Sequence, residues 1–197
     1  MKKGEKRKQE LLQIAYRLFI SRGYERTSVD EIIEEAGIAK GTYYYYFESK
    51  EAMLEEVIDM MIRAQEDRAA KILEGDIAVP RKVMGILSCF RLSGEEQAIG
   101  EALNTPENTL MHEMTNRKII DAITPIMSAA VEEGVTDGVF SCDHIPERVR
   151  IIMIVSNRLF DDIAFTEDDI EVFIDMIEKM LGAKKSVMSF IRDYIQK

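Results

Sequence analysis

The most constraining feature of the sequence is the segment TSVDEIIEEAGIAKGTYYYYFESK, residues 27–50. Ser28, followed three residues later by Glu31, has the pattern of a capping box, in which the hydroxyl and the carboxylate satisfy free N–H groups at a helix start. Apolar residues then recur at helical spacing up to Gly37, a residue type that permits the left-handed conformation common at helix ends. The segment therefore predicts a short helix, a tight turn and a second short helix over about residues 40–46.

Four consecutive tyrosines, residues 43–46, dominate the second of these helices. Successive helical residues point about 100° apart, so no single face can bury all four rings. We expect Tyr43 to pack inward beside Phe47 and the other three rings to face outward, where phenol hydroxyls can donate hydrogen bonds to phosphate oxygens. Two short helices joined in this way form a helix-turn-helix, whose second helix can enter the major groove of DNA.

Basic and small residues frame the tyrosines. Lys40 offers a cation for a phosphate or a guanine edge, Gly41 lets a backbone approach closely, and Thr42 is short enough to touch a thymine methyl group. Lys50 adds a phosphate partner in the first turn of the next helix. Taken singly, such residues more often belong to a solvated surface, and a helical hairpin whose tyrosines only cover the core is the alternative. Taken together with the tyrosine run, they favour a DNA-binding helix.

Residues 6–54 resemble the DNA-binding domain of the tetracycline-repressor (TetR) family of bacterial transcriptional regulators. The resemblance is carried by an apolar first helix ending in LFISRGYERTSV, by EIIEEAGIAKGTYYYYF and by FESKEAML. It implies that the following residues lie at the DNA: Thr27, Ser28, Lys40, Gly41, Thr42, Tyr44, Tyr45, Tyr46 and Lys50. A departure is Ile38, where many relatives carry a polar or small residue, and its role as base contact or packing residue stays open.

The predicted fold class is all-α. Of the 197 residues, 46% are hydrophobic, which is enough for a sizeable core, and helical spacing recurs along the chain with few prolines to interrupt it. The resemblance implies an N-terminal three-helix helix-turn-helix domain, residues 1–48, followed by a helical ligand-binding and dimerisation domain, residues 49–197. No apolar run reaches the roughly 18 to 20 residues of a membrane span, and the charged N-terminus does not resemble a signal peptide, so we expect a cytoplasmic protein.

The net charge of −10 is unevenly distributed. Residues 1–50 carry ten Lys or Arg and eight Asp or Glu, whereas the remainder carries 16 and 28. The basic residues are concentrated at the start, at positions 2, 3 and 6–8, where they are expected to meet phosphates. The acidic remainder would repel a duplex and so discourage non-specific binding by the wrong face.

Apolar residues at helical spacing predict further helices in the second part of the chain. Their expected ranges are 49–74, a helix from residue 80, 95–103, 105–133, 146–165, 167–181 and a helix in the tail after residue 182. Pro125 lies inside one of them, so we expect a kink or break near Asp121. Thr166 and Asp169 have the pattern of a helix cap.

The helices expected near 146–165 and 167–181 resemble the pair through which this family forms homodimers as a four-helix bundle. Two DNA half-sites need two DNA-binding helices, which favours the dimer. The alternative is that the apolar stripes of both helices only face the core of one chain.

The family resemblance also implies a small-molecule pocket between helices of the second part. Eleven of the twelve methionines follow residue 50, and flexible Met side chains suit a pocket that adapts to apolar or aromatic compounds, although ordinary core packing explains each of them equally well. Arg117 would matter most for an anionic ligand. The predicted ligand-binding residues are Met84, Phe90, Leu110, Met111 and Met114, with Arg117 and Asn157 as polar anchors.

The main hypothesis is a homodimeric, ligand-responsive transcriptional regulator, expected to be a repressor that a small molecule releases from operator DNA. A DNA-binding protein without an effector is the second hypothesis, which a fully packed body would favour. An enzyme is the third, but the chain has no nucleotide-binding glycine pattern, no HExxH motif and no convincing Ser/His/Asp set. Its two histidines and two cysteines lack metal-ligand spacing, so neither a metal nor a cofactor is expected.

Overall fold

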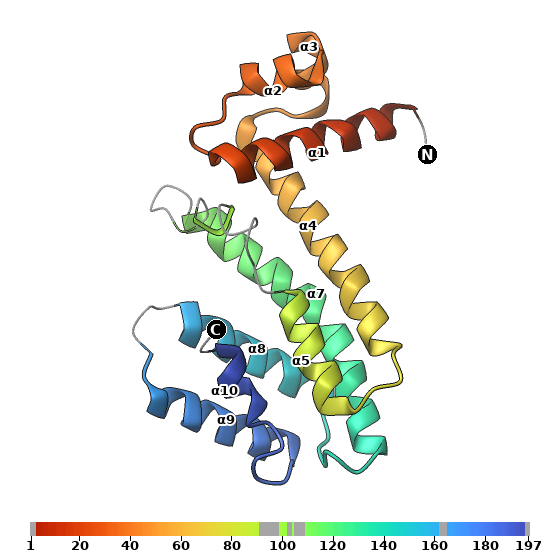
Figure 1. Cartoon of the computed structure of the whole chain (residues 1–197), viewed down its shortest axis with the longest axis vertical. Helices are drawn as coiled ribbons and strands as arrows, with labels where there is room; N and C mark the ends of the chain where they lie inside the picture. The colour runs from red at the N-terminus through yellow and green to blue at the C-terminus, as the bar shows by residue number, and fades with distance from the viewer. Residues whose placement is uncertain (1–2, 91–98, 102–103, 105–108, 162–164, 196–197) are drawn as a thin grey trace. The chain divides into compact units, whose positions relative to one another are not determined.

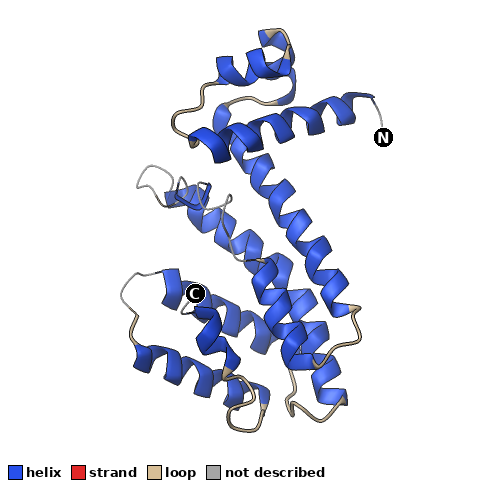
Figure 2. Ribbon diagram, in the orientation of Figure 1, coloured by secondary structure: helices blue, strands red, loops and turns tan. Residues whose placement is uncertain are grey.

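The structure, a computed structural model, describes residues 3–90, 99–101, 104, 109–161 and 165–195. Within these ranges every regular element is a helix, which confirms the predicted all-α class (Figures 1 and 2). None of the described helices combines the length and the apolar character needed to cross a membrane.

The helices largely follow the expected ranges. They are α1 (Lys3–Arg22), α2 (Val29–Ala36), α3 (Lys40–Tyr46), α4 (Lys50–Leu73), α5 (Val79–Cys89), α7 (Thr109–Thr136), α8 (Ile145–Asp161), α9 (Glu167–Leu181) and α10 (Phe190–Ile195). The helix expected over 95–103 lies mostly outside the described residues.

Pro125 does not break α7, so of the kink or break expected near Asp121, the break is wrong. A proline inside a helix cannot donate to the carbonyl four residues earlier, which here belongs to Asp121. Both residues are exposed, so water can satisfy that carbonyl and the helix continues to Thr136.

The chain forms two compact units. The N-terminal unit comprises the described residues within 1–63 and 92–115, and the C-terminal unit comprises those within 64–91 and 116–197. Helix α4 begins in the first and ends in the second.

The core of the N-terminal unit is built from the apolar stripes of α1 and α4 and from single residues of α2 and α3. Burial of such side chains is the main favourable term in folding a small helical unit. Its fully buried members include Leu11, Ala15, Phe19, Ile32, Tyr43, Met53, Leu54 and Val57.

The C-terminal unit combines an apolar core with an ion pair whose cation is buried. Lys82 of α5 is 5% exposed, and its Nζ lies 2.7 and 2.6 Å from the two carboxylate oxygens of Glu133 on α7. A cation this buried requires its partner, because an unpaired buried charge is strongly destabilising. The pair therefore holds α5 against α7.

Both ends of α9 are fixed by local interactions. At its start, the predicted cap is a full capping box between Thr166 and Asp169. At its end, Gly182 adopts a left-handed conformation with φ of 61°. The earlier loop between α7 and α8 reaches this point, where the Ser141 N–H donates to the Leu181 carbonyl at 2.9 Å.

Two glycines with positive φ give a matched stability test. Gly138 has φ of 70° and open space around it, whereas a Cβ on Gly182 would lie 2.1 Å from the Ser141 carbonyl oxygen. We expect Gly138→Ala to cost about 1 kcal/mol through the left-handed conformation alone. We expect Gly182→Ala to cost about 3 kcal/mol or more, because the obstructing atoms are backbone. Urea unfolding of both variants measures the difference, and equal losses would contradict the close approach at Gly182.

Candidate nucleic-acid interface and cavity

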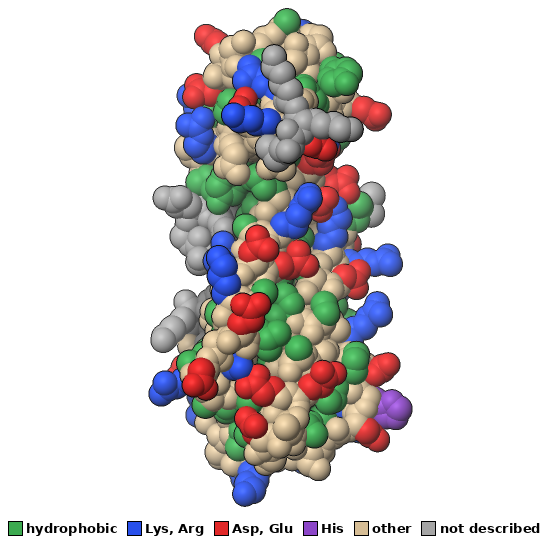
Figure 3. All heavy atoms as spheres, turned by 90° about the vertical axis from the view of Figure 1, so that its right-hand side faces the viewer, with side chains coloured by type: hydrophobic (Ala, Val, Ile, Leu, Met, Phe, Trp, Pro, Cys, Tyr) green, Lys and Arg blue, Asp and Glu red, His purple; other side chains and the backbone are tan. Residues whose placement is uncertain are grey.

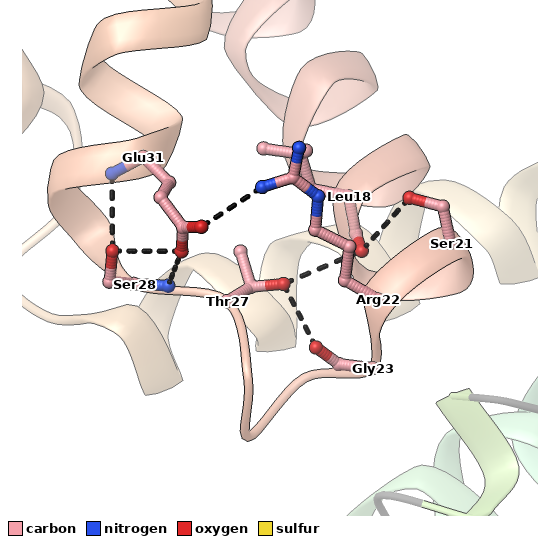
Figure 4. A network of polar contacts seen from close by, with 7 residues as sticks. All are labelled: Leu18, Ser21, Arg22, Gly23, Thr27, Ser28 and Glu31. Carbon is pink, nitrogen blue, oxygen red and sulfur yellow. Dashed lines mark hydrogen bonds and ion pairs between the residues drawn. The ribbon is translucent and has the colours of Figure 1, made fainter.

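The start of α2 is fixed by the predicted capping box (Figure 4). The Ser28 backbone N–H donates to Glu31 Oε2 at 2.8 Å, and the Glu31 N–H donates to Ser28 Oγ at 3.2 Å. Arg22, at the end of α1, donates to the other Glu31 oxygen at 2.9 Å. The backbone and hydroxyl hydrogen bonds from Ser28, followed by the charge of Arg22, hold the pKa of Glu31 below its usual value.

The connector between α1 and α2 is tied to the start of α4. The Thr27 hydroxyl lies 2.9 Å from the Gly23 carbonyl and 3.4 Å from the Leu18 carbonyl (Figure 4). Lys50 Nζ donates to the carbonyls of Tyr24 and Thr27 at 3.1 and 3.3 Å, and it lies 4.1 Å from the centroid of the Tyr24 ring. Both side chains therefore have a structural role in addition to the predicted role at DNA.

A short turn joins α2 to α3. Gly37 has φ of 60°, as the sequence predicted, and its N–H donates to the Glu34 carbonyl. Ile38, the residue that departs from the family pattern, is half-buried. Lys40, in the first turn of α3, lies 3.2 Å from the Asp30 carboxylate, and both side chains are mostly exposed. An exposed pair of this kind is weak, so Lys40 can exchange Asp30 for another anion at little cost.

Tyr43 is the inward residue of α3, which confirms the prediction. Its side chain is 0% exposed, its ring centroid lies 5.7 Å from that of Phe47, and its hydroxyl donates to the Ser49 carbonyl at 3.2 Å. These contacts fix the rotation of α3 about its own axis.

The outward face of α3 carries most of the predicted DNA-binding residues. Tyr45 is 81% exposed and Tyr44 is 49% exposed, while Tyr46 and Thr42 are half-buried. A Cβ on Gly41 would meet no atom within 4 Å, so the space beside this residue is open. The structure thus places these five residues and Lys40 on one short helix.

Besides Lys50, two predicted contacts lie off α3. Ser28 is exposed at the start of α2, whereas the side chain of Thr27 is 1% exposed. A DNA contact from the Thr27 side chain stays a prediction that this burial does not favour.

Sequence reasoning missed the internal partners of the basic N-terminal residues. Arg7 donates to the Ala36 carbonyl at 3.1 Å, at the end of α2, and also pairs with Glu10. Lys8 lies 2.6 Å from Glu56 of α4. The Arg7–Glu10 pair has a recognisable spacing of three residues, but nothing in the sequence indicates the contacts with Ala36 or Glu56. On the face drawn in Figure 3, acidic and basic side chains are interspersed rather than gathered in separate blocks.

The C-terminal unit contains a partly open cavity of about 500 Å³. Helices α5, α7, α8 and α9 and the segment that includes α10 contribute to its wall, and Phe165 adds to it. Representative lining residues are Val83, Leu87, Phe90, Ile120, Ile123, Met127, Met153, Ser156, Asn157, Phe173, Ile177, Met188 and Ile191.

Two of the predicted ligand-binding residues, Phe90 and Asn157, line this cavity. Met84, Met111, Met114 and Arg117 are not among its lining residues, and the Leu110 side chain lies outside the described part of the structure. The Arg117 side chain is 82% exposed. For these residues a ligand contact stays a prediction that the cavity does not support.

Within the described ranges, no group of His, Cys, Asp and Glu side chains is arranged to hold a metal ion. Cys89 and Cys142 are free and half-buried. Burial raises the pKa of the Cys142 thiol, although the nearby Arg148 opposes this shift, so the reactive thiolate is disfavoured.

Comparison with known proteins gives consistent matches. The family model for bacterial regulatory proteins of the tetR family matches residues 11–57. The transcriptional regulator EthR of Mycolicibacterium smegmatis is 31% identical over 138 residues, which cover 66% of this chain and 64% of EthR, just under two thirds of its length. The transcriptional repressor KstR2 of the same organism is 28% identical over 141 residues, which cover 70% of this chain and 69% of KstR2.

Solved structures share the fold at low sequence identity. The crystal structure of RolR with its ligand resorcinol has a TM-score of 0.65 and 17% identity, with 99% of this chain and 95% of RolR covered. A transcriptional regulator from Cytophaga hutchinsonii has a TM-score of 0.61 and 20% identity, with 88% and 94% covered.

The capping box predicts a pH-dependent stability difference. The pKa of Glu31 is lower in the folded protein than its usual value of 4.5, so its stabilising contribution is present above pH 4.5 and is lost as the pH falls through the folded pKa. We expect Glu31→Gln to destabilise the protein at pH 7 and to differ progressively less from the wild type below pH 4.5. Urea unfolding between pH 7 and 3 measures this, with Glu34→Gln on the same helix as control. A difference that does not change with pH would contradict the assignment.

Proposed function

Because the chain belongs to the tetR family of bacterial regulatory proteins, we propose that it is a transcriptional regulator that binds DNA through α3 and responds to a small molecule. We assign DNA binding to residues 1–48, and effector binding and dimerisation to residues 49–197. We propose that the protein is a repressor and that binding of the effector releases it from operator DNA. The observation that carries DNA binding is the exposed Tyr45 and Tyr44 on a helix that Tyr43 anchors.

The outward side chains of α3 match the chemistry of a DNA backbone and groove. The exposed hydroxyls of Tyr44 and Tyr45 can donate to phosphate oxygens, which positions a protein on a duplex. Lys40 supplies a cation, and the open space beside Gly41 permits close approach of the helix to a base pair or sugar. Thr42 and Lys40 are the residues we expect to affect base preference.

A homodimer would present two such helices. Successive major grooves on one face of a duplex lie about 34 Å apart, so paired recognition helices read two half-sites. Helices α8 and α9 pack together and expose apolar side chains, with Ile151, Ile154 and Val172 exposed by 50, 47 and 68%. Exposed apolar side chains on adjacent helices support these helices as the dimer contact, together with the corresponding helices of a second copy.

The cavity supports a small-molecule effector over a DNA-binding protein without one. A fully packed C-terminal unit would have favoured the second hypothesis, whereas RolR, which has a similar fold, binds resorcinol. An effector can change DNA affinity only by the ratio of its affinities for two conformations of the protein, the one that binds DNA and the one that does not. A hundredfold ratio corresponds to about 2.7 kcal/mol of coupling.

Helix α5 provides a route from the cavity to α4. Val83 and Leu87 line the cavity, and Gly85 between them approaches Ile72 of α4 so closely that a Cβ would lie 3.0 Å from Ile72 Cγ2. A shift of the α5 wall therefore presses directly on the end of α4. The same helix begins at Lys50, next to the proposed DNA-binding helix.

The DNA-binding proposal predicts a loss of affinity without a loss of stability. Binding sequences are first selected from a random duplex pool, and the dissociation constant is then measured by fluorescence anisotropy. We expect Tyr45→Ala to weaken binding at least tenfold, because a hydrogen bond to a charged phosphate is lost. Its thermal midpoint should not change, since the ring is 81% exposed. Lys71→Ala on α4 is the control. Failure to select any sequence, or unchanged affinity in Tyr45→Ala, would count against the proposal.

The dimer proposal predicts that a charge on the exposed face of α8 or α9 separates the protomers. We expect Ile154→Asp and Val172→Asp each to shift the protein from dimer to monomer, because a carboxylate would be buried without a partner. Ile77→Asp, at an exposed apolar residue that precedes α5, should leave the dimer intact. Sedimentation velocity distinguishes the two states, and a wild-type monomer would refute the assignment.

A further inference from the structure

We propose that the cavity of the C-terminal unit selects uncharged, largely apolar molecules with a single hydrogen-bonding group, which Asn157 and Ser156 of α8 hold. This inference rests on the proposed effector-binding function and adds the chemical class of the effector. It departs from the expectation that Arg117 anchors an anionic ligand, because the Arg117 side chain is 82% exposed and does not line the cavity.

The described wall of the cavity carries no charged side chain. Apart from Ser156 and Asn157, every described lining residue is aliphatic, aromatic or methionine. Moving an ion from water into such surroundings is costly unless a partner of opposite charge is present. A sulfonate, carboxylate or ammonium group on a ligand would find no such partner in this wall.

Two buried charged residues close in sequence to the wall, Lys82 and Glu178, are already paired. Lys82, next to the lining residue Val83, binds Glu133. Glu178 is 7% exposed, and its carboxylate accepts the Met188 N–H at 3.0 Å. Recruiting either group to a ligand would break a buried interaction, so neither provides a free charge for recognition.

Asn157 and Ser156 are the polar groups of the described wall. An amide offers two donors and one acceptor with two lone pairs, and a hydroxyl both donates and accepts. In the described part of the chain, no side-chain hydrogen bond joins either group to another residue. One hydroxyl, amine or carbonyl on an apolar ligand can therefore bind here, and adjacent positions on α8 restrict that contact to one region of the wall.

The rest of the wall favours ligands that contain rings, but it accommodates ligands of different shapes. Phe90 and Phe173 provide aromatic surfaces that bind other rings in edge or offset arrangements. Met127, Met153 and Met188 come from three different segments, and their flexible side chains adapt to ligands of different outline. The cavity is thus suited to a class of lipophilic ring compounds.

Two dyes with the same carbon framework test the charge selection. N-phenyl-1-naphthylamine is neutral and has one N–H donor, whereas 8-anilinonaphthalene-1-sulfonate adds only a sulfonate. Titration of the full-length protein, followed by fluorescence, should give at least tenfold tighter binding of the neutral dye. Equal or tighter binding of the sulfonate, removed by Arg117→Ala, would overturn the proposal.

Two variants test where the neutral dye binds. Asn157→Leu should weaken its binding two- to tenfold, the usual range for one lost hydrogen bond. The same substitution should not weaken the binding of 1-benzylnaphthalene, in which a methylene replaces the N–H. Binding of this ligand is measured by its competition with the neutral dye. Ile120→Trp should abolish binding of both by filling the cavity, while Arg150→Ala on α8 should change neither. Equal effects of Asn157→Leu on both ligands would overturn the role of Asn157.

The DNA measurement separates this inference from the proposed function. Selective binding of the neutral dye without any effect on DNA affinity would support the cavity chemistry and contradict the effector role. DNA binding by a protein that does not bind the neutral dye would overturn the cavity chemistry alone. Circular dichroism of each variant, together with retained 1-benzylnaphthalene binding in Asn157→Leu, shows that the fold is intact.

Discussion

The burial of one ring, that of Tyr43, determines what α3 presents to its surroundings. The ring packs beside Phe47, and burial raises the pKa of Tyr43 to about 12, so the hydroxyl remains a neutral donor to the Ser49 carbonyl at physiological pH. Since successive residues point about 100° apart, fixing this residue turns Tyr44 and Tyr45 outward. The proposed DNA-binding surface thus depends on a contact that DNA itself would never touch.

Local interactions are the part of this fold that the sequence predicted well. Both capping boxes, Ser28 with Glu31 and Thr166 with Asp169, join residues three apart, so their pattern is complete within one helical turn. Gly37 likewise acts within its own turn. The contacts that sequence reasoning missed join distant segments or use backbone carbonyls. Lys50 is an example, because no side-chain pattern marks the carbonyls of Tyr24 and Thr27 as its acceptors.

The cavity shows a second limit of sequence reasoning. Met84 and Phe90 were both expected to contact a ligand, but they lie six residues apart, so around the axis of α5, which ends just before Phe90, they point about 120° apart. Phe90 lines the cavity and Met84 does not. An apolar residue at helical spacing is recognisable in the sequence, whereas the neighbour that each face meets depends on the packing of α7 to α10. Asn157 and Arg117 were both predicted as polar anchors, and only Asn157 lines the cavity.

Helix α8 has a different partner on each of its faces. Met153, Ser156 and Asn157 line the cavity, while Ile151 and Ile154 are exposed on the face that we assign to the dimer. In the proposed dimer, a ligand held by Asn157 would therefore act on a helix that also forms the contact between the two copies. A second route from the cavity to α4 runs through α5. Gly85 has no side chain, so its backbone packs directly against Ile72.

Both routes impose the same thermodynamic condition. If a ligand lowers DNA affinity by some factor, DNA must lower ligand affinity by that factor, whichever helix carries the change. A rigid cavity of fixed shape would bind the ligand equally in both states and transmit nothing. The methionines of the wall would let the proposed ligand site adapt to different molecules, whereas the Lys82–Glu133 ion pair joins α5 to α7. Under the proposed function, adaptable contacts in the cavity wall and a fixed contact between α5 and α7 would allow ligands of different outline to displace these two helices together.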